Sequence, residues 1–413
     1  MKASMRRAWA VLAVAAAPLL AAVDASAIPA FADRLGVECH MCHQGFPKLN
    51  KTGYRFKERG FRLDNEDPFQ ITDWIKSIPV RARASATRNL RQRADDSTVG
   101  FVRLVSAGSF GRHVSYWADA GFLFDDSENT KTYTEPTDIW VRLDILSDGK
   151  LYVRAGRMEL DLPFTQVRTP QLFSYPMYFS SSGREQDAVG AYQRALEIGG
   201  SLSGDRYHWS AAVTGGAEDP VGDGILEAAG RPRETGDFEG NLFLRASRRG
   251  DTSRFGVFSY VGRNTLAAVV PTGPQSWRDH LLRVGGDADL WPLSKLNVYG
   301  LYMYARNSDS APATGGGGGS GIAASFHGGF AQADYHLVEK SVPGPLKDVA
   351  LALTARASWQ QRPTSALTAN ESITAFHPGF RFWLRERFRL SVEYGFEGQG
   401  RSDRGAVQAE LVF

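Results

Sequence analysis

From about residue 79 to the end of the chain, apolar and polar residues alternate in short segments. The clearest segment alternates Phe388, Leu390, Val392, Tyr394 and Phe396 with Arg389, Ser391, Glu393 and Gly395. Because successive side chains of a β-strand point to opposite faces, such a segment would have one apolar and one polar face. Segments of about ten residues with this period, separated by turn residues, are typical of strands that cross a membrane as a closed barrel.

We count about sixteen such segments, and bacterial barrels of this kind usually have an even number of strands. The segments begin near Val80, Gly100, Val114, Asp138, Leu151, Val189, Tyr207, Phe238, Arg254, His280, Leu296, Phe326, Val349, Ile373, Phe388 and Ala406. Tight turns, such as residues 148–150 and 204–205, alternate with long polar loops, such as residues 125–136, 161–187 and 218–237. Short turns belong in the periplasm and long loops outside the cell. This loop alternation favours a membrane barrel over a soluble β-sandwich or propeller.

We therefore expect residues 79–413 to form an all-β, antiparallel, porin-like barrel of about sixteen strands in the outer membrane of a Gram-negative bacterium. The final residue, Phe413, resembles the C-terminal aromatic assembly signal of such barrels. After residue 27, no stretch approaches the roughly 18 continuous apolar residues of a helical span. Lipid of the outer membrane would contact the apolar face. The net charge of +3 gives no reason to expect a nucleic-acid partner.

The N-terminal residues predict export. A basic start is followed by an apolar run over residues 8–23 and by the small-residue pattern Ala25-Ser26-Ala27. This is the pattern of a signal peptide, which we assign to residues 1–27, with the mature chain beginning at Ile28. A membrane anchor is the alternative, but the apolar run is short for a span and stops at Asp24.

Both cysteines of the chain lie in the sequence Cys39-His40-Met41-Cys42-His43. This spacing is the attachment pattern of a c-type haem. Two thiols with two residues between them reach the two vinyl groups of the porphyrin, and His43 then lies where it can ligate the iron. A zinc site would need a second ligand pair nearby, and a redox couple would need a βαβ context. A structural disulfide is the third alternative. We predict one covalent haem c on Cys39 and Cys42, with His43 as proximal ligand.

Residues 28–78 would form a small α-helical haem c segment that plugs the barrel. No His or Met lies between Gln44 and Val80, where an independent cytochrome c would normally carry its second axial ligand. The sixth iron position is therefore open, or a barrel residue fills it. Several residues could do so because their place in the alternating pattern predicts a side chain that points into the barrel. They are Met158, His377, His208, Met303 and His113, with Met177 as a further candidate if its loop folds inward.

Other side chains could contact the haem. Candidates for packing against the porphyrin are Phe46, Leu49, Phe56 and Phe61, with Gly53 and Gly60 allowing close approach. The alternative is that these residues simply pack a small helix. Arg81, Arg83 and Arg154 have inward parity and could neutralise the haem propionates, although inward arginines are also usual in porin lumens.

The haem segment resembles a known family. The matching residues are the CxxCH unit followed by Phe46, Pro47, Leu49, Asn50, Gly53, Phe56, Lys57 and Gly60. In these residues the chain is similar to the fused monohaem cytochrome–porins of the outer membrane, whose best-known members oxidise ferrous iron. The match covers only a small N-terminal part of the chain. It implies a cytochrome-type oxidoreductase, a ferrous iron oxidase, that takes electrons from extracellular Fe(II) or another donor and passes them through the haem to a periplasmic c-type cytochrome.

Two other functions fit the same pattern. The electrons could flow outward to an extracellular acceptor, or the barrel could be a solute porin whose haem plug gates it or senses redox state. A conduit should have a plugged lumen and a haem that is reducible from outside, whereas a porin should conduct ions. Electron transfer through a haem needs no protein acid or base, so the absence of a catalytic motif is expected.

Overall fold

The computed structural model describes most of the barrel and part of the N-terminal segment. The described residues are Phe31, Val37, 41–43, 48–63, 80–91, 97–125, 132–162, Phe164, Leu172, 192–217, 233–234, 240–270, 273–308, 324–338, 349–365, 368–384, 388–398 and 404–412. Within them, no helix is long and apolar enough to cross a membrane.

The described elements are one α-helix, one 3₁₀ turn and a series of strands. They are α3 (Lys51–Glu58), β1 (Val80–Arg91), β2 (Ser97–Phe110), β3 (Val114–Asp125), β4 (Thr132–Leu146), η2 (Ser147–Gly149), β5 (Leu151–Glu159), β6 (Tyr192–Leu202), β7 (Tyr207–Ala217), β8 (Arg233–Glu234), β9 (Asn241–Arg249), β10 (Ser253–Val270), β11 (Gly273–Leu293), β12 (Leu296–Asn307), β13 (Ala324–Val338), β14 (Val349–Ser365), β15 (Thr368–Leu384), β16 (Phe388–Glu397) and β17 (Arg404–Val412).

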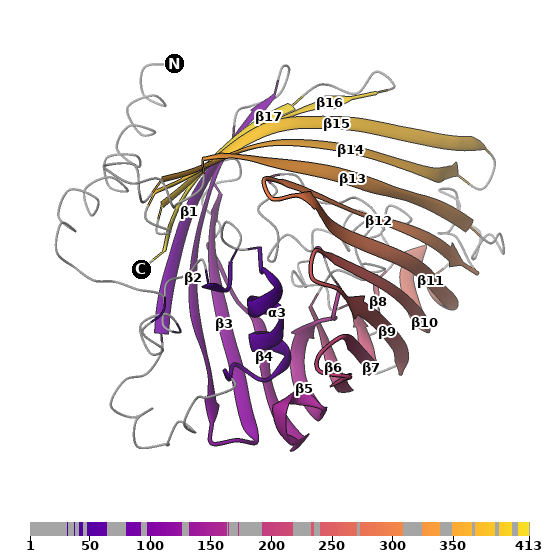
Figure 1. Cartoon of the computed structure of the whole chain (residues 1–413). Helices are drawn as coiled ribbons and strands as arrows, with labels where there is room; N and C mark the ends of the chain where they lie inside the picture. The colour runs from indigo at the N-terminus through magenta and orange to yellow at the C-terminus, as the bar shows by residue number, and fades with distance from the viewer. Residues whose placement is uncertain are drawn as a thin grey trace.

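The strands form one closed antiparallel sheet (Figure 1). Each strand pairs with its neighbours in the chain, and β1 closes the ring by pairing with β17 in a register that places Ser85 opposite Glu410. The two-residue strand β8 is an addition on β10, so the 17-stranded sheet is a barrel of 16 strands. Closure leaves no free sheet edge, and this satisfies the backbone hydrogen bonds that lipid could not.

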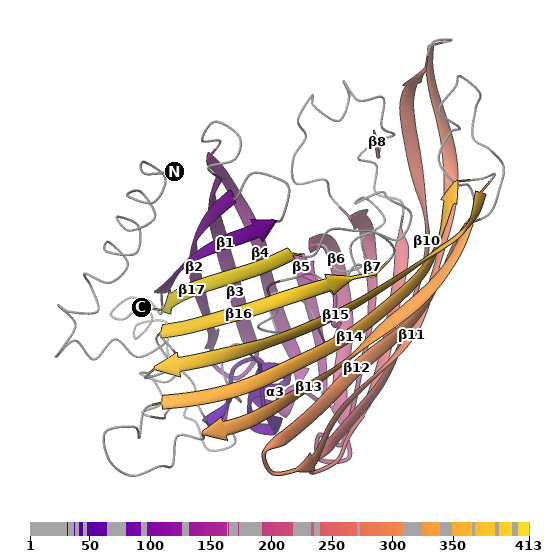
Figure 2. The ribbon, with the colours of Figure 1, turned by 90° about the horizontal axis from the view of Figure 1, so that it is seen from above.

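The predicted strand order and number are confirmed, but several strands are longer than predicted. β11 begins at Gly273 instead of near His280, and β3 and β4 reach Asp125 and Thr132, inside the predicted loop 125–136. Figure 2 shows the β10–β11 hairpin projecting beyond the other strands. Outside the membrane a strand needs no apolar face, so these extensions carry no alternating pattern that a sequence could reveal.

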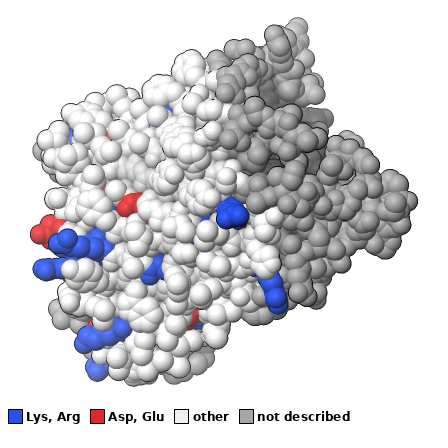
Figure 3. Space-filling view, turned by 90° about the vertical axis from the view of Figure 1, so that its right-hand side faces the viewer, with Lys and Arg blue, Asp and Glu red and all other residues white. Residues whose placement is uncertain are grey.

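The outer face of the barrel is an apolar belt. On β4, Ile139, Val141 and Leu143 are 45%, 56% and 51% exposed, whereas the intervening Trp140 and Arg142 are buried. This is the predicted parity, with apolar residues outward and polar residues inward. Figure 3 shows one side of the molecule as a largely white surface with a few charged residues on it, several of them at its edge. Such a belt is the surface that lipid contacts in outer-membrane barrels.

The N-terminal segment lies inside the ring of strands. In both Figures 1 and 2, α3 lies within the barrel, and its side chains contact inward-facing residues of the wall. We call residues 41–43 and 48–63 the plug segment. The helix begins after Asn50, whose side-chain oxygen accepts a hydrogen bond from the Gly53 amide at 3.0 Å. An Asn at this position satisfies one of the free amides at a helix start.

The chain directly after β5 also turns into the lumen, which corrects the prediction of an external loop for Asp161, Leu162, Phe164 and Leu172, while the rest of residues 161–187 lies outside the described residues. Leu160, Leu162 and Phe164 are fully buried against inward-facing aromatic residues of the wall. The Phe164 ring lies 5.0 Å from that of Tyr299. Further along, the Leu172 amide donates to Glu393 of β16 at 2.9 Å. The described residues of the β5–β6 connection therefore lie in the lumen, and the side of the lumen around Phe164 is apolar.

Candidate functional site

The described part of the haem motif is folded onto the start of α3. The Asn50 backbone amide donates to the Cys42 carbonyl at 2.9 Å, and the Asn50 side-chain amide donates to the Met41 carbonyl at 3.0 Å. His43 forms an isolated antiparallel bridge with Leu49. Asn50 therefore caps the helix and also fixes the loop that carries Cys42 and His43. Cys39 and Phe46 lie outside the described residues.

Gly53 lets this loop approach the helix. A Cβ atom at this position would overlap the carbonyl oxygen of Cys42 and would lie 2.9 Å from Leu49 Cδ2. The close approach therefore requires glycine. These contacts fix the backbone of residues 41–43 against the start of α3 and so place Cys42 and His43 beside the helix.

Cys42 is a free thiol whose surroundings are partly apolar. Burial raises the pKa of Cys42 above its ordinary value of 9.0. Within the described residues, no group of three or more His, Cys, Asp or Glu side chains could hold a metal ion. The described sulfur and nitrogen donors at the start of α3 are therefore one thiol, Cys42, and one imidazole, His43.

An aromatic cluster connects the plug segment to the wall. Phe61 stacks on Trp140 of β4, with ring centroids 5.8 Å apart, and the Phe56 ring also lies 5.8 Å from Phe61. Met158 of β5 is fully buried in this cluster. Phe56, predicted to line the porphyrin, packs against Phe61 in this cluster, and Leu49 lies beside Gly53.

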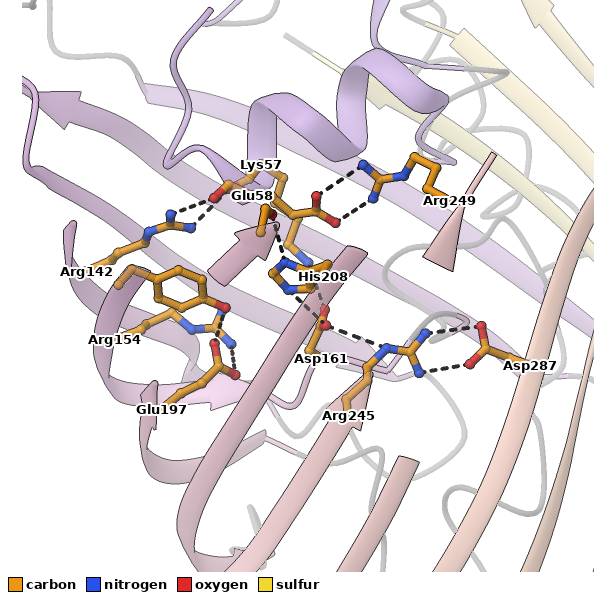
Figure 4. A network of polar contacts seen from close by, with 12 residues as sticks. Lys57, Glu58, Arg142, Arg154, Asp161, Glu197, His208, Arg245, Arg249 and Asp287 are labelled. Carbon is orange, nitrogen blue, oxygen red and sulfur yellow. Dashed lines mark hydrogen bonds and ion pairs between the residues drawn. The ribbon is translucent and has the colours of Figure 1, made fainter. Parts of the chain in front are cut away.

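The C-terminal end of α3 is held by two arginines of the wall (Figure 4). Arg249 of β9 donates to both carboxylate oxygens of Glu58, at 2.5 and 3.1 Å. Arg142 of β4 donates to the Glu58 carbonyl at 2.5 Å. Because the last carbonyls of a helix have no partners within it and carry partial negative charge, a guanidinium there is stabilising.

Further ion pairs join the plug segment to the strand ends. Arg55 and Arg59 both contact Asp205 in the β6–β7 turn, at 3.0 and 2.7 Å. Arg62 pairs with Asp144 of β4. Lys51 contacts Asp251 in the β9–β10 turn at 2.6 Å. These turns are short, and the plug segment therefore lies at the short-turn end of the barrel.

Lys48 is buried where the plug segment meets β11 and β12. Its ammonium donates to Asn297, lies 3.5 Å from Asp289, and is 3.6 Å from the centroid of the Tyr299 ring. Burial lowers the pKa of Lys48, although Asp289 acts in the opposite direction. A buried amine is stabilised by this combination of a carboxylate, an amide oxygen and an aromatic face.

Asp161 links the plug, the wall and the β5–β6 connection. It lies 3.9 Å from Lys57 of α3, 3.5 Å from His208 of β7 and 3.6 Å from Arg245 of β9 (Figure 4). Burial alone would raise the pKa of Asp161. The hydrogen bond from His208 and the charges of Lys57 and Arg245 overcome that effect and hold the pKa well below its usual value of 3.8.

The structure places the candidates for the second iron ligand in different parts of the barrel. Met158 lies in the aromatic cluster of the plug, and His208 lies in the Asp161 network under α3. His377 is buried on β15 beside Gly395, away from both groups, and Met303 lies in the apolar cluster of the β5–β6 connection. The His113 ring contacts the Asp144 carbonyl at 2.8 Å in the β2–β3 turn region. Met177 lies outside the described residues.

Two of the arginines that were predicted to point inward form ion pairs with carboxylates of the barrel wall. Arg83 pairs with Glu410 of β17, and Arg154 contacts Glu197 of β6 at 2.8 Å. Both point inward as predicted. Arg81 lies in β1, and its side chain is outside the described residues. The residues that hold the plug, such as Asp205 and Arg249, were missed by sequence reasoning. The only signal was the basic character of residues 48–62, which requires acidic partners somewhere in the lumen.

No protein-family model and no curated protein matches the chain. Solved structures do match its fold. OprB of Pseudomonas putida has a TM-score of 0.54 at 9% identity, covering 83% of this chain and 96% of that one. OmpT of Vibrio cholerae, an outer-membrane protein, has a TM-score of 0.53 at 8% identity, covering 82% and 99%. DcaP of Acinetobacter baumannii, an outer-membrane channel, has a TM-score of 0.51 at 12% identity, covering 84% and 100%. The chain thus has the fold of a 16-stranded outer-membrane barrel.

Proposed function

We propose that this chain is an outer-membrane electron-transfer protein of the cytochrome–porin type. It would carry one haem c, take electrons from an extracellular donor, with ferrous iron as the first candidate, and pass them to a periplasmic c-type cytochrome. The observation that carries the proposal is that the loop of Cys42 and His43 is fixed to a helix, and that ion pairs lock this helix inside a closed barrel.

Cys39 and Cys42 would hold the haem through their sulfur atoms, and His43 would be its proximal ligand. The haem would supply one-electron redox chemistry. Asn50 and Gly53 orient the attachment loop against α3. The aromatic cluster around Phe61 and the β5–β6 connection around Phe164 fill the adjacent lumen with apolar side chains and so exclude water from it.

The test is an optical titration of the purified, oxidised protein with ferrous iron under anoxia. Covalent haem is verified first, by mass and by haem staining of the denatured chain. Rapid appearance of a reduced c-type spectrum is the expected result. A haem that dithionite reduces but ferrous iron does not would exclude ferrous iron as donor and would favour another donor or electron export.

The likeness to outer-membrane channels favours a second candidate, a solute porin whose haem plug regulates it. Planar-bilayer conductance discriminates between the two. A conduit with this plug segment and this lumen filling should show no open-channel current of porin size. Stable large conductance in the haem-loaded protein, with no reduction from outside, would favour the porin.

A further inference from the structure

Three short turns and the plug segment form one continuous surface at the mouth of the barrel. The Arg249 amide donates to the Arg206 carbonyl at 2.7 Å and so joins the β6–β7 and β9–β10 turns. The Trp291 amide donates to the Thr252 carbonyl at 2.8 Å and joins the β9–β10 turn to the end of β11. The Lys51–Asp251 pair connects the helix to the same turns. We call these turns, with the exposed residues of the plug segment, the plug rim.

The haem-attachment loop is exposed at the plug rim. Met41, inside the CxxCH motif, is 38% exposed, and its carbonyl is fixed by Asn50 at the start of α3. The Lys51 side chain, one residue further, is 49% exposed. A partner that exchanges electrons with a haem on Cys42 from the short-turn side would therefore contact this surface. In barrels of this class the short turns face the periplasm.

The charges of the plug rim do not balance. Asp251 is paired with Lys51, and Asp205 is shared by Arg55 and Arg59 of the plug segment. Arg206 and Lys295 are exposed, and neither forms a direct ion pair with a carboxylate among the described residues, although the charge of Arg206 contributes to the lowered pKa of Asp251. Among the described residues, the plug rim and its contacts therefore carry more basic than acidic side chains.

We propose that the plug rim is the docking surface for an electron-transfer protein with an acidic face. This inference rests on the proposed function, and it adds the location of the contact and the charge of the partner. Excess charge of one sign attracts a protein of the opposite sign and accelerates its encounter, and salt screens this effect. One electron would pass from the ferrous haem to the oxidised metal centre of the partner.

Anionic phospholipid is the other negatively charged surface that a basic rim could contact. Lipid headgroups lie around the outside of the barrel, where outward residues such as Arg248 of β9 meet them. Arg206 and Lys295 instead lie in turns beyond the strand ends, next to turns that contact the plug segment. Their position favours a protein partner that covers the mouth.

The experiment uses the full-length, haem-loaded protein, reduced and mixed in a stopped-flow instrument with an oxidised probe. The probes are plastocyanin, a small acidic copper protein, and mitochondrial cytochrome c, which is basic. The variant R206E/K295E reverses two charges of the plug rim. The matched control R263E/R306E reverses two exposed charges on β10 and β12 toward the long-loop end.

We expect the second-order rate constant with plastocyanin to fall about tenfold between low and high salt, as for electrostatically steered encounters. R206E/K295E should lower this rate constant about tenfold at low salt and R263E/R306E less than about twofold. Cytochrome c should show the opposite salt dependence.

The outcomes separate the two proposals. A protein without reducible haem defeats the proposed function, and plastocyanin binding to the immobilised protein then tests the rim alone. Rates or binding that are insensitive to salt, or equally affected in both double variants, would overturn the docking surface. Unchanged plastocyanin rates with weaker binding of R206E/K295E to phosphatidylglycerol vesicles would assign the rim to lipid and overturn the proposal as well.

Discussion

Glu58 of the plug helix and Arg249 of the barrel wall form a two-point ion pair, with both carboxylate oxygens within 3.1 Å of the guanidinium nitrogens. The Glu58 and Arg249 side chains are only 12% and 7% exposed. The same helix end accepts a hydrogen bond from Arg142. These contacts join the segment that was predicted to plug the barrel to two different parts of the wall.

Replacing Glu58 with Ala should therefore loosen the plug. Loss of one partner leaves Arg249 buried without its carboxylate, and such a change typically costs about 3 kcal/mol. We expect a lower thermal transition of the plug segment and new ion conductance in planar bilayers. K51A is the control, because the Lys51–Asp251 pair is exposed and screened by solvent. Equal effects of E58A and K51A would contradict this prediction.

Gly53→Ala should reduce haem attachment. The added methyl group would overlap the Cys42 carbonyl oxygen and push the attachment loop away from α3. We expect less covalent haem per chain, measured by the pyridine haemochrome spectrum of protein matched for barrel content. Gly286→Ala is the control, because a Cβ there lies 3.5 Å from its nearest neighbour. Normal haem content in G53A would show that the loop can relax.

Met158→Ala should create a cavity between plug and wall. The side chain is fully buried beside Phe56 and Phe61, and such truncations typically cost about 2–5 kcal/mol. Met158→Leu keeps the volume and should cost less than about 1.5 kcal/mol. Urea unfolding followed by tryptophan fluorescence measures both. The haem spectrum separates packing from ligation, because only loss of an iron ligand would make M158L change its spin state.

The low pKa of Asp161 predicts that the plug becomes less stable in acid. Its pKa in the folded protein is well below the ordinary value of 3.8. Its contribution to stability is therefore fully present above that ordinary value and is lost as the pH falls through the folded-state pKa. We expect plug release, followed by conductance, to increase below about pH 4. D161N should be less stable at neutral pH and should lose this acid dependence. An unchanged acid transition in D161N would assign it to other carboxylates.

The alternating pattern predicted the barrel because it reports burial on one face. Segments such as 388–396 have one apolar and one polar side, and their strands begin where the pattern begins. The alternating pattern gave no information about which residues fill the lumen. On β12 both faces are apolar, so the inward Tyr299 and Met303 gave no sign that the β5–β6 connection covers them.

The partners of the plug segment could not be predicted for a related reason. Arg55 and Asp205 are 150 residues apart, and their meeting depends on the closure of the whole sheet. The motif at Cys42 and His43 consists of residues that are adjacent in the chain, and so the sequence alone could indicate it. The charge of the plug was visible in the sequence, whereas the identity of each carboxylate that neutralises it was not.

The distance in sequence between the plug and its contacts also has a consequence for biogenesis. Lys48 meets Asn297, 249 residues later, and its other partners lie on strands that all follow it in the chain. The plug segment therefore has no complete docking site until strands up to β12 have assembled. Its cysteines would remain accessible in the periplasm during that interval, which is when a haem could be attached before the wall encloses the helix.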